Sequence, residues 1–258
     1  MNRSSQSRSA SRFVEHVPSA LLPSDPNMYW RLSVEEKRLV SQLTEAYTVT
    51  QSAQTYVKLS RPSTLCGDQG HSIIGHMAKD MVHFFTTVSD FCSLPARDQA
   101  AALSFSAMPL FLLRNAFAAS RDFEETDIPT IISDSHVASR EELVQLLCQF
   151  QRSLRPVLRN DIATAAILQC AVVFDARAPD AWDRQRINRL QDKYMILMKH
   201  YVESQCSYLF CWHYVEQMLT LVQEARTLGV MVTRQFKGWK NIIDPLIQQL
   251  VHPEEEKG

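Results

Sequence analysis

Residues 91–114 read FCSLPARDQAAALSFSAMPLFLLR and hold the most hydrophobic helical pattern of the chain. We expect the helix within this stretch to start at Ser93, with Pro95 in its first turn. Proline is tolerated there because the N–H groups of the first turn have no hydrogen-bond partner within the helix. Residues 100–113 are almost wholly apolar, which predicts a helix buried on all sides. Pro109 lies inside it, and we expect a kink there because the proline ring removes one hydrogen bond and crowds the preceding turn.

A single charged residue, Arg114, follows this apolar run. A buried guanidinium needs a partner, because leaving it bare is strongly unfavourable. Two interpretations remain open. Arg114 pairs with a backbone carbonyl or an acidic side chain near the end of the helix, or it faces a cavity and meets the polar group of a small ligand.

Helical patterns dominate the rest of the chain, which has only 6 glycines and 11 prolines in 258 residues. Ser33 and Glu36 form a capping box at the start of a helix over residues 32–47, and Ser139 and Glu142 form a second box. Further helices are expected over residues 71–91, 139–154, 160–174, 180–204 and 208–236. Residues 121–136 are rich in Ile, Thr and turn residues and are the one stretch for which we expect β structure, a small hairpin.

The two ends of the chain differ from this helical body. Residues 1–30 are rich in Ser, Arg and Pro, which indicates a disordered N-terminal tail. Residues 31–252 are predicted to form one all-α domain, and residues 253–258 a charged C-terminal tail. The segment DPLIQQLV, residues 244–251, is too short to be a stable helix alone, so its apolar side chains need a surface to pack on.

Composition and motifs argue against several function classes. The 27 Lys and Arg balance 28 Asp and Glu, so the chain lacks the basic excess of a nucleic-acid-binding domain. No run of 18 apolar residues is present, so we expect no membrane-spanning segment. No catalytic motif or zinc spacing occurs, and His71 and His76 are five residues apart, off the spacing that places two ligands on one helix face. The six cysteines form no C-x-x-C pair and are expected to be reduced and mostly buried. We therefore expect no enzyme activity, no metal and no cofactor.

The same stretch, residues 91–114, resembles the signature of nuclear receptor ligand-binding domains, F-x-x-L-x-x-x-D-Q followed by a buried helix and an arginine. The residues that carry the resemblance are Phe91, Leu94, Asp98, Gln99, Leu103 and Arg114. Other segments arrive in the order of that family: residues 32–47 resemble its first helix, 166–201 its eighth and ninth, and PLIQQLV its last. The resemblance covers about residues 30–252 and leans toward the branch of the vitamin D, farnesoid X and liver X receptors.

The resemblance implies a fold and a ligand site. The fold would be a three-layer antiparallel helical sandwich of about 11–12 helices with one small β-hairpin, whose cavity the last helix closes. The implied ligand is small and apolar, a sterol or fatty acid, with its polar end at Arg114. The implied ligand-binding residues are Ile73, Ile74, Met77, Met108, Phe111, Leu112, Arg114, Asn115, Val230, Met231 and Arg234. Alternatively, these large side chains fill the space themselves and no ligand binds.

The resemblance also implies a groove that binds L-x-x-L-L helices of coregulators. Its residues would be Val82, Phe85, Thr86, Gln99, Leu103, Ser104, Gln249 and Leu250. Family members hold the peptide helix with charged side chains at its two ends, whereas Thr86, Ser104 and Gln249 are neutral here. Each missing charge would weaken peptide binding by about 0.3–1 kcal/mol, so we expect weak or altered coregulator recruitment. Pro109 also departs from the family pattern, in which an acidic residue is common.

The partners implied are a second copy of the chain or a receptor of the retinoid X type, docked through residues 208–226. No cysteine precedes Cys66, so we expect this chain to lack the zinc-binding DNA-binding module of the family and to make no contact with nucleic acid or membrane. Either the chain is a fragment of a longer receptor, or it is an atypical receptor that acts through protein contacts only. The location implied is the nucleus, or the nucleus together with the cytoplasm. Two alternatives stay open: an atypical receptor that lacks the DNA-binding module and acts as a dimerising corepressor, and a helical lipid carrier or enzyme.

Overall fold

A computed structural model describes residues 32–50, 68–122, 138–158, 161–205, 208–235, 241, 243–245 and 247. For parts of several helices, including residues 68–74, only the backbone is described. The described residues are helical with short connections and contain no strand, which confirms the all-α class. The expected hairpin falls mostly outside them, except that residues 121 and 122 are helical and not β structure.

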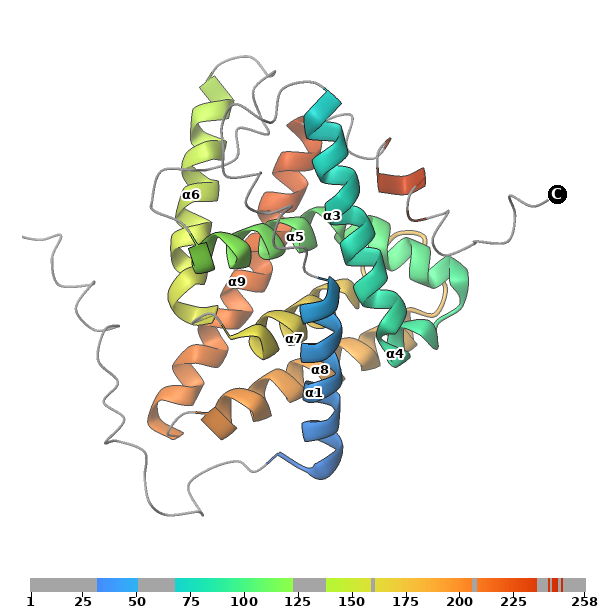
Figure 1. The fold of residues 1–258 in the computed structure, drawn as a ribbon, viewed down its shortest axis with the longest axis vertical. Coiled ribbons are helices and arrows are strands. Elements are labelled where there is room, and N and C mark those ends of the chain that lie inside the picture. Colours follow the sequence, from blue (N-terminus) through green and yellow to red (C-terminus); the bar gives the residue numbers. More distant parts are fainter. Residues whose placement is uncertain are drawn as a thin grey trace, which may run out of the picture.

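The described helices follow one another along the whole domain (Figure 1). Their bounds are α1 (Val34–Thr50), α3 (Asp68–Thr87), α4 (Ser89–Cys92), α5 (Ala96–Asp122), α6 (Ala138–Leu158), α7 (Ile162–Val173), α8 (Arg184–Gln205) and α9 (Tyr208–Gln235). A short helical segment follows at residues 243–245 and 247, which we call the C-terminal turn.

Several helix starts follow from local hydrogen bonds. The capping box predicted for α1 is confirmed, because Glu36 N–H donates to Ser33 Oγ at 3.1 Å and Ser33 N–H donates to Glu36 Oε2 at 2.8 Å. The second predicted box is wrong in register: α6 already begins at Ala138, so Ser139 lies inside its first turn. Asp161 caps α7, and its carboxylate accepts hydrogen bonds from the N–H groups of Ala163 and Thr164.

The long helix expected over residues 71–91 is broken in two. Val88 between α3 and α4 is extended, with φ −81° and ψ 109°. The hydroxyls of Thr86 and Thr87 bond back to the carbonyls of His83 and Phe84, and two threonines followed by a valine form a β-branched run that favours a helix end. Likewise Ser93 does not start α5. It caps the end of α4, where its hydroxyl donates to the Asp90 carbonyl.

The helices α5 and α7 lie at the centre of the molecule. α7 contacts α1, α5 and α8, and α5 contacts α3, α6, α7 and α9. Figure 1 shows α5 and α7 running across the molecule behind the upright α3 and α1. Every residue of α7 from Ala163 to Val173 is buried, as its all-apolar pattern predicts.

α5 has, over Ala96–Phe117, the length and apolar composition of a helix that could cross a membrane. However, 83% of its most apolar window is buried inside the protein, which is typical of a core helix. The helix runs on through Pro109, and Gly229 of α9 lies directly against that proline: a Cβ at position 229 would come within 2.7 Å of the Pro109 ring. Glycine at 229 therefore permits the close approach of α9 to α5.

Candidate functional site

Arg114 lies in the core of the protein, with 1% of its surface exposed. Its Nε donates to Gln169 Oε1 on α7 at 2.7 Å. The guanidinium carbon lies 5.0 Å from the ring centroid of Tyr47 on α1 and 5.4 Å from that of Phe84 on α3. Three helices far apart in the sequence therefore surround this one side chain.

The partner of Arg114 is a neutral side-chain amide. The sequence alone predicts instead a backbone carbonyl, an acidic side chain or the polar group of a ligand. Its Nη1 and Nη2 are buried without a hydrogen-bond partner among the described residues. The two aromatic faces offset part of the desolvation, since a desolvated cation–π contact contributes about 2 kcal/mol or more. Arg114 thus remains a buried cation with unused donors, a chemical property that suits a polar group brought in from outside.

Gln169 is not among the residues predicted from the sequence, although a signal is present. It is the one residue with a side-chain amide in the apolar run of α7, as Arg114 is the first charged residue after the apolar run of α5. Two long polar side chains in the apolar parts of two core helices are expected to pair with each other, because buried polar groups are almost always hydrogen-bonded.

A pocket of about 460 Å³ opens between α5, the segment after α7, α9 and the C-terminal turn. We call it the α5–α9 pocket. Its apolar wall is formed by Phe105, Met108, Pro109 and Val230, and its volume lies within the range of small-molecule sites, about 300–1,000 Å³. The charged residues of the lining are three arginines and two aspartates: Arg177, Arg226, Arg234, Asp180 and Asp244.

The predicted ligand-binding residues divide between this pocket and the core. Met108, Val230 and Arg234 line the α5–α9 pocket. Met77, Phe111, Leu112, Arg114 and Asn115 are buried, and Met231 packs half-buried against the core. The side chains of Ile73 and Ile74 lie outside the described residues. The predicted set therefore does not form one site: Arg114 meets α1, α3 and α7, whereas Met108 and Val230 face the pocket beside α9.

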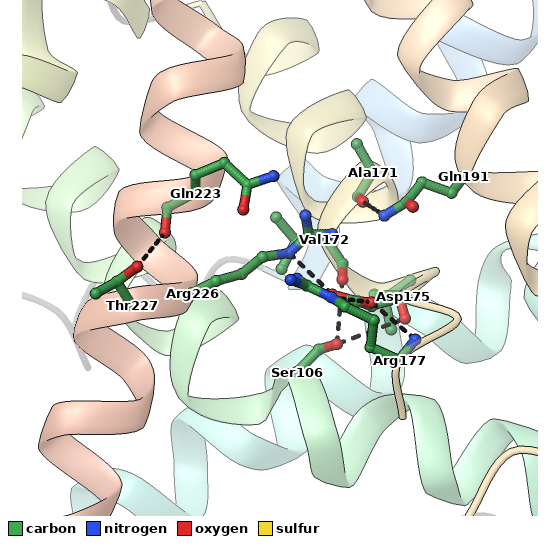
Figure 2. A network of polar contacts seen from close by, with 10 residues as sticks. Ser106, Ala171, Val172, Asp175, Arg177, Gln191, Gln223, Arg226 and Thr227 are labelled. Atoms are coloured by element: carbon green, nitrogen blue, oxygen red, sulfur yellow. Dashed lines mark hydrogen bonds and ion pairs between the residues drawn. The ribbon is translucent and has the colours of Figure 1, made fainter. Parts of the chain in front are cut away.

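A polar cluster borders the pocket where the chain leaves α7 (Figure 2). Asp175 is 3% exposed, and its carboxylate forms ion pairs with two arginines. Arg177 donates to it through Nε at 2.9 Å and Nη2 at 2.7 Å, and Arg226 of α9 approaches with its Nε at 3.0 Å. One carboxylate therefore holds two guanidinium groups, one from its own loop and one from a helix about 50 residues further on.

The pKa values of this cluster reflect the shared charge. Burial alone would raise the pKa of Asp175, but the hydrogen bonds from Arg177 and the charge of Arg226 outweigh it, so the pKa lies below its ordinary value. The hydrogen bond to Asp175 raises the pKa of Arg177. Burial lowers the pKa of Arg226, partly opposed by Asp175 and reinforced by the neighbouring charge of Arg177.

The predicted groove residues lie at two depths. Val82, Phe85 and Leu103 are wholly buried, with 0% exposure. Thr86 is exposed, and the half-buried Gln99 donates its amide to the Leu94 carbonyl at 2.8 Å. Gln249 and Leu250 lie outside the described residues. Polar side chains thus form the accessible edge of this surface.

Ser104 links α5 to the C-terminal turn. Its hydroxyl donates to Asp244 Oδ1 at 2.6 Å. Ile243 and Ile247 of the same turn are each 1% exposed, so the turn is packed onto the domain. The expectation that an apolar segment near residue 247 needs a surface is thereby confirmed for the described part of it.

Asp98 ties the start of α5 to the α7–α8 connection. It is 0% exposed, and its two carboxylate oxygens accept the backbone N–H groups of Trp182 at 2.7 Å and Asp183 at 3.3 Å. Asp98 belongs to the sequence signature of residues 91–114. The signature does not predict that Asp98 binds the α7–α8 connection, because it does not indicate which backbone N–H groups donate hydrogen bonds to the carboxylate.

No group of three or more His, Cys, Asp or Glu side chains suited to a metal is present in the described part of the chain. The described cysteines Cys92, Cys148, Cys170 and Cys211 are free thiols. Burial raises the pKa of Cys170 well above its ordinary value, which disfavours the reactive thiolate.

No known protein family matches the chain, and no curated protein is similar to it in sequence.

Proposed function

We propose that the chain is the ligand-binding and coregulator-docking domain of a nuclear receptor, a ligand-regulated transcription factor of the nucleus. In this proposal a small apolar ligand biases the docking of the C-terminal turn, and the docked turn completes a surface for L-x-x-L-L helices. The ligand would change the population of docked turns rather than create a new structure.

The observation that carries the proposal is the packing of the C-terminal turn on α5, through the Ser104–Asp244 hydrogen bond and the buried Ile243 and Ile247. A segment this short has no stable fold of its own, so its order depends on the surface beneath it. An element of that kind is suited to being ordered conditionally, which a ligand switch requires.

The central position of α5 and α7 supports the finer fold assignment, a three-layer helical sandwich. α1 contacts α7 and α3 contacts α5, while α6 and α9 also contact α5. The buried Arg114 with its unused donors supports a polar anchor for the ligand inside such a fold.

Peptide binding tests the proposal directly. We expect a fluorescent L-x-x-L-L peptide to bind the full chain weakly, and deletion of residues 244–258 to abolish binding while the circular dichroism spectrum keeps its helical form. Global unfolding of the deletion variant would instead make the C-terminal turn an ordinary part of the core and would contradict the proposal.

A charge added at the edge of the groove gives a sharper test. Thr86 is exposed, so Thr86→Lys is tolerated by the fold and supplies the basic group that the family resemblance places there. A dipole contribution of about 0.3–1 kcal/mol corresponds to roughly two- to fivefold tighter peptide binding. Thr48→Lys on the exposed face of α1 is the matched control and should leave the affinity unchanged.

The neutral groove edge also favours a second candidate, an atypical receptor that acts as a dimerising corepressor and recruits coactivators poorly. Ser104 contributes to this edge with a hydroxyl that is already bonded to Asp244. The two candidates differ in their peptides: an atypical corepressor should prefer a longer corepressor helix over a short L-x-x-L-L peptide in a competition assay. Native mass spectrometry of the purified chain shows whether a small apolar molecule co-purifies.

A further inference from the structure

The α5–α9 pocket combines an apolar wall with a cationic end. Phe105 is 40% exposed and Val230 is 50% exposed, and Met108 lies in the same lining. Large apolar side chains that are solvent-exposed inside a concave site are typical of a place where a ligand is buried. The cationic end of the pocket is formed by Arg226 of α9 and by Arg177, which lies in the α7–α8 connection.

The charge at that end is not balanced by its own counter-ion. Arg177 and Arg226 share the single carboxylate of Asp175, so this ion-paired cluster of three residues carries one positive charge more than it has negative charges. Nη2 of Arg226 is buried without a hydrogen-bond partner among the described residues. The side chain of Arg177 is 61% exposed, so part of this cationic group is open to an incoming ligand.

Backbone geometry places the cationic end beside the apolar wall. Because Gly229 has no side chain, α9 lies against the Pro109 ring, and Arg226 is one turn before Gly229 on the same helix. The side chain of Pro109 is an apolar ring, so it cannot accept a hydrogen bond from the Arg226 guanidinium. The two aspartates of the lining are placed differently: Asp244 accepts a hydrogen bond from the Ser104 hydroxyl, and the exposed Asp180 is not ion-paired with Arg177 or Arg226.

We propose that the α5–α9 pocket is a second ligand site, which binds an amphipathic carboxylate. The carboxylate pairs with the Arg177 and Arg226 guanidinium groups, and the apolar body of the molecule covers Phe105, Met108 and Val230. This site is separate from Arg114, because Arg114 meets α1, α3 and α7 and is absent from the lining. The proposal does not depend on membership of the chain in any receptor family.

Dodecanoate is a suitable probe, and dodecanol is its uncharged counterpart. We expect isothermal titration of the full chain to show dodecanoate binding with at least roughly tenfold higher affinity than dodecanol, since a charge-assisted hydrogen bond is lost with the alcohol. Arg177→Gln leaves Asp175 paired with Arg226 and removes the surplus charge, so it should weaken dodecanoate binding roughly tenfold. Arg189→Gln, an exposed arginine of α8 outside the pocket, is the matched control and should bind as the parent chain does.

A second variant locates the bound molecule. Val230→Glu places a carboxylate on the exposed apolar wall, and it should abolish dodecanoate binding at this pocket while the melting temperature changes little. Equal affinities for acid and alcohol, or an affinity unaffected by both Arg177→Gln and Val230→Glu, would overturn the proposal. These outcomes are distinct from failure of the receptor assignment, which is measured by L-x-x-L-L peptide binding.

Discussion

At the scale of single residues, the core contains one cation whose side-chain partner is a neutral amide. Arg114 and Gln169 come from the two central helices, and their hydrogen bond of 2.7 Å is the one polar link between them that involves a charge in the described residues. Such a pair contributes little net stability, because both groups are desolvated on folding. Removing only one of them is nevertheless costly, because the other stays buried.

Substitution of Gln169 tests this asymmetry. Gln169→Leu leaves the guanidinium without its acceptor and should lower the free energy of unfolding by about 1.5–3 kcal/mol in urea titrations. The double variant Gln169→Leu with Arg114→Met should recover most of this loss, because apolar side chains of similar size then fill the site. Two additive losses would show that the pair does not act as a unit.

Asp175 should make the stability of the protein depend on pH. Its pKa in the folded chain lies below its ordinary value of 3.8, so folding favours the ionised carboxylate. The stabilisation is therefore fully present at neutral pH and is lost as the pH falls below 3.8 toward the folded pKa. The Asp175→Asn variant should be less stable than the parent at neutral pH, and the difference in unfolding free energy should shrink as the pH falls through this window. A difference that stays constant from neutral pH down through the window would contradict the role of the ionised carboxylate.

At the scale of helices, the sequence is a good guide to most elements and a poor one to their breaks. The capping box at Ser33 and the all-apolar pattern of α7 depend on neighbours within a few residues, so both could be predicted. The break at Val88 is not predicted, because the apolar stripe that continues across it from α3 into α4 outweighs the local signal of the β-branched run Thr86, Thr87 and Val88. Contacts between distant segments such as Asp175–Arg226 could not be predicted either, because no local pattern indicates which residues of distant elements meet.

Gly75 of α3 and Gly229 of α9 offer a matched pair of variants. Gly75 of α3 has open space where a Cβ would lie, so Gly75→Ala should stabilise the chain by about 0.5–1 kcal/mol through helix propensity. Gly229→Ala gains the same propensity but places its Cβ within 2.7 Å of the Pro109 ring, which is rigid. We expect a net loss of roughly 1–2 kcal/mol, because overpacking typically costs about 1–3 kcal/mol.

Thermal unfolding of the two variants followed by circular dichroism measures the difference. Pairing Gly229→Ala with Pro109→Ala removes the ring and should restore stability to at least that of the parent chain. If Gly229→Ala alone behaves as Gly75→Ala does, the close approach of α9 to α5 is not a constraint on the fold.

At the scale of the whole molecule, several large apolar side chains are exposed to solvent rather than packed in the core. Trp212 is 68% exposed and Leu219 is 41% exposed, and both lie on α9. They are seven residues apart, so they lie on one face of the helix, about two turns from each other. Single exposed apolar residues are common on protein surfaces, but an aromatic and a leucine in register on a long helix fit the dimer surface predicted for residues 208–226.

Charge substitution on this face tests whether it pairs two chains. Trp212→Arg with Leu219→Arg should convert a dimer into a monomer in multi-angle light scattering, because a homodimer places the same face of both copies together and so brings the new charges close to one another. The free energy of unfolding of the dissociated chain should change little, since both side chains already contact solvent. The matched control is Val49→Arg, which changes a residue that is 74% exposed on a different helix, α1, and should not alter the oligomeric state. A chain that is monomeric before any substitution, at concentrations well above those of the cell, would remove this surface as a homodimer interface and leave it to a different partner of the same apolar character.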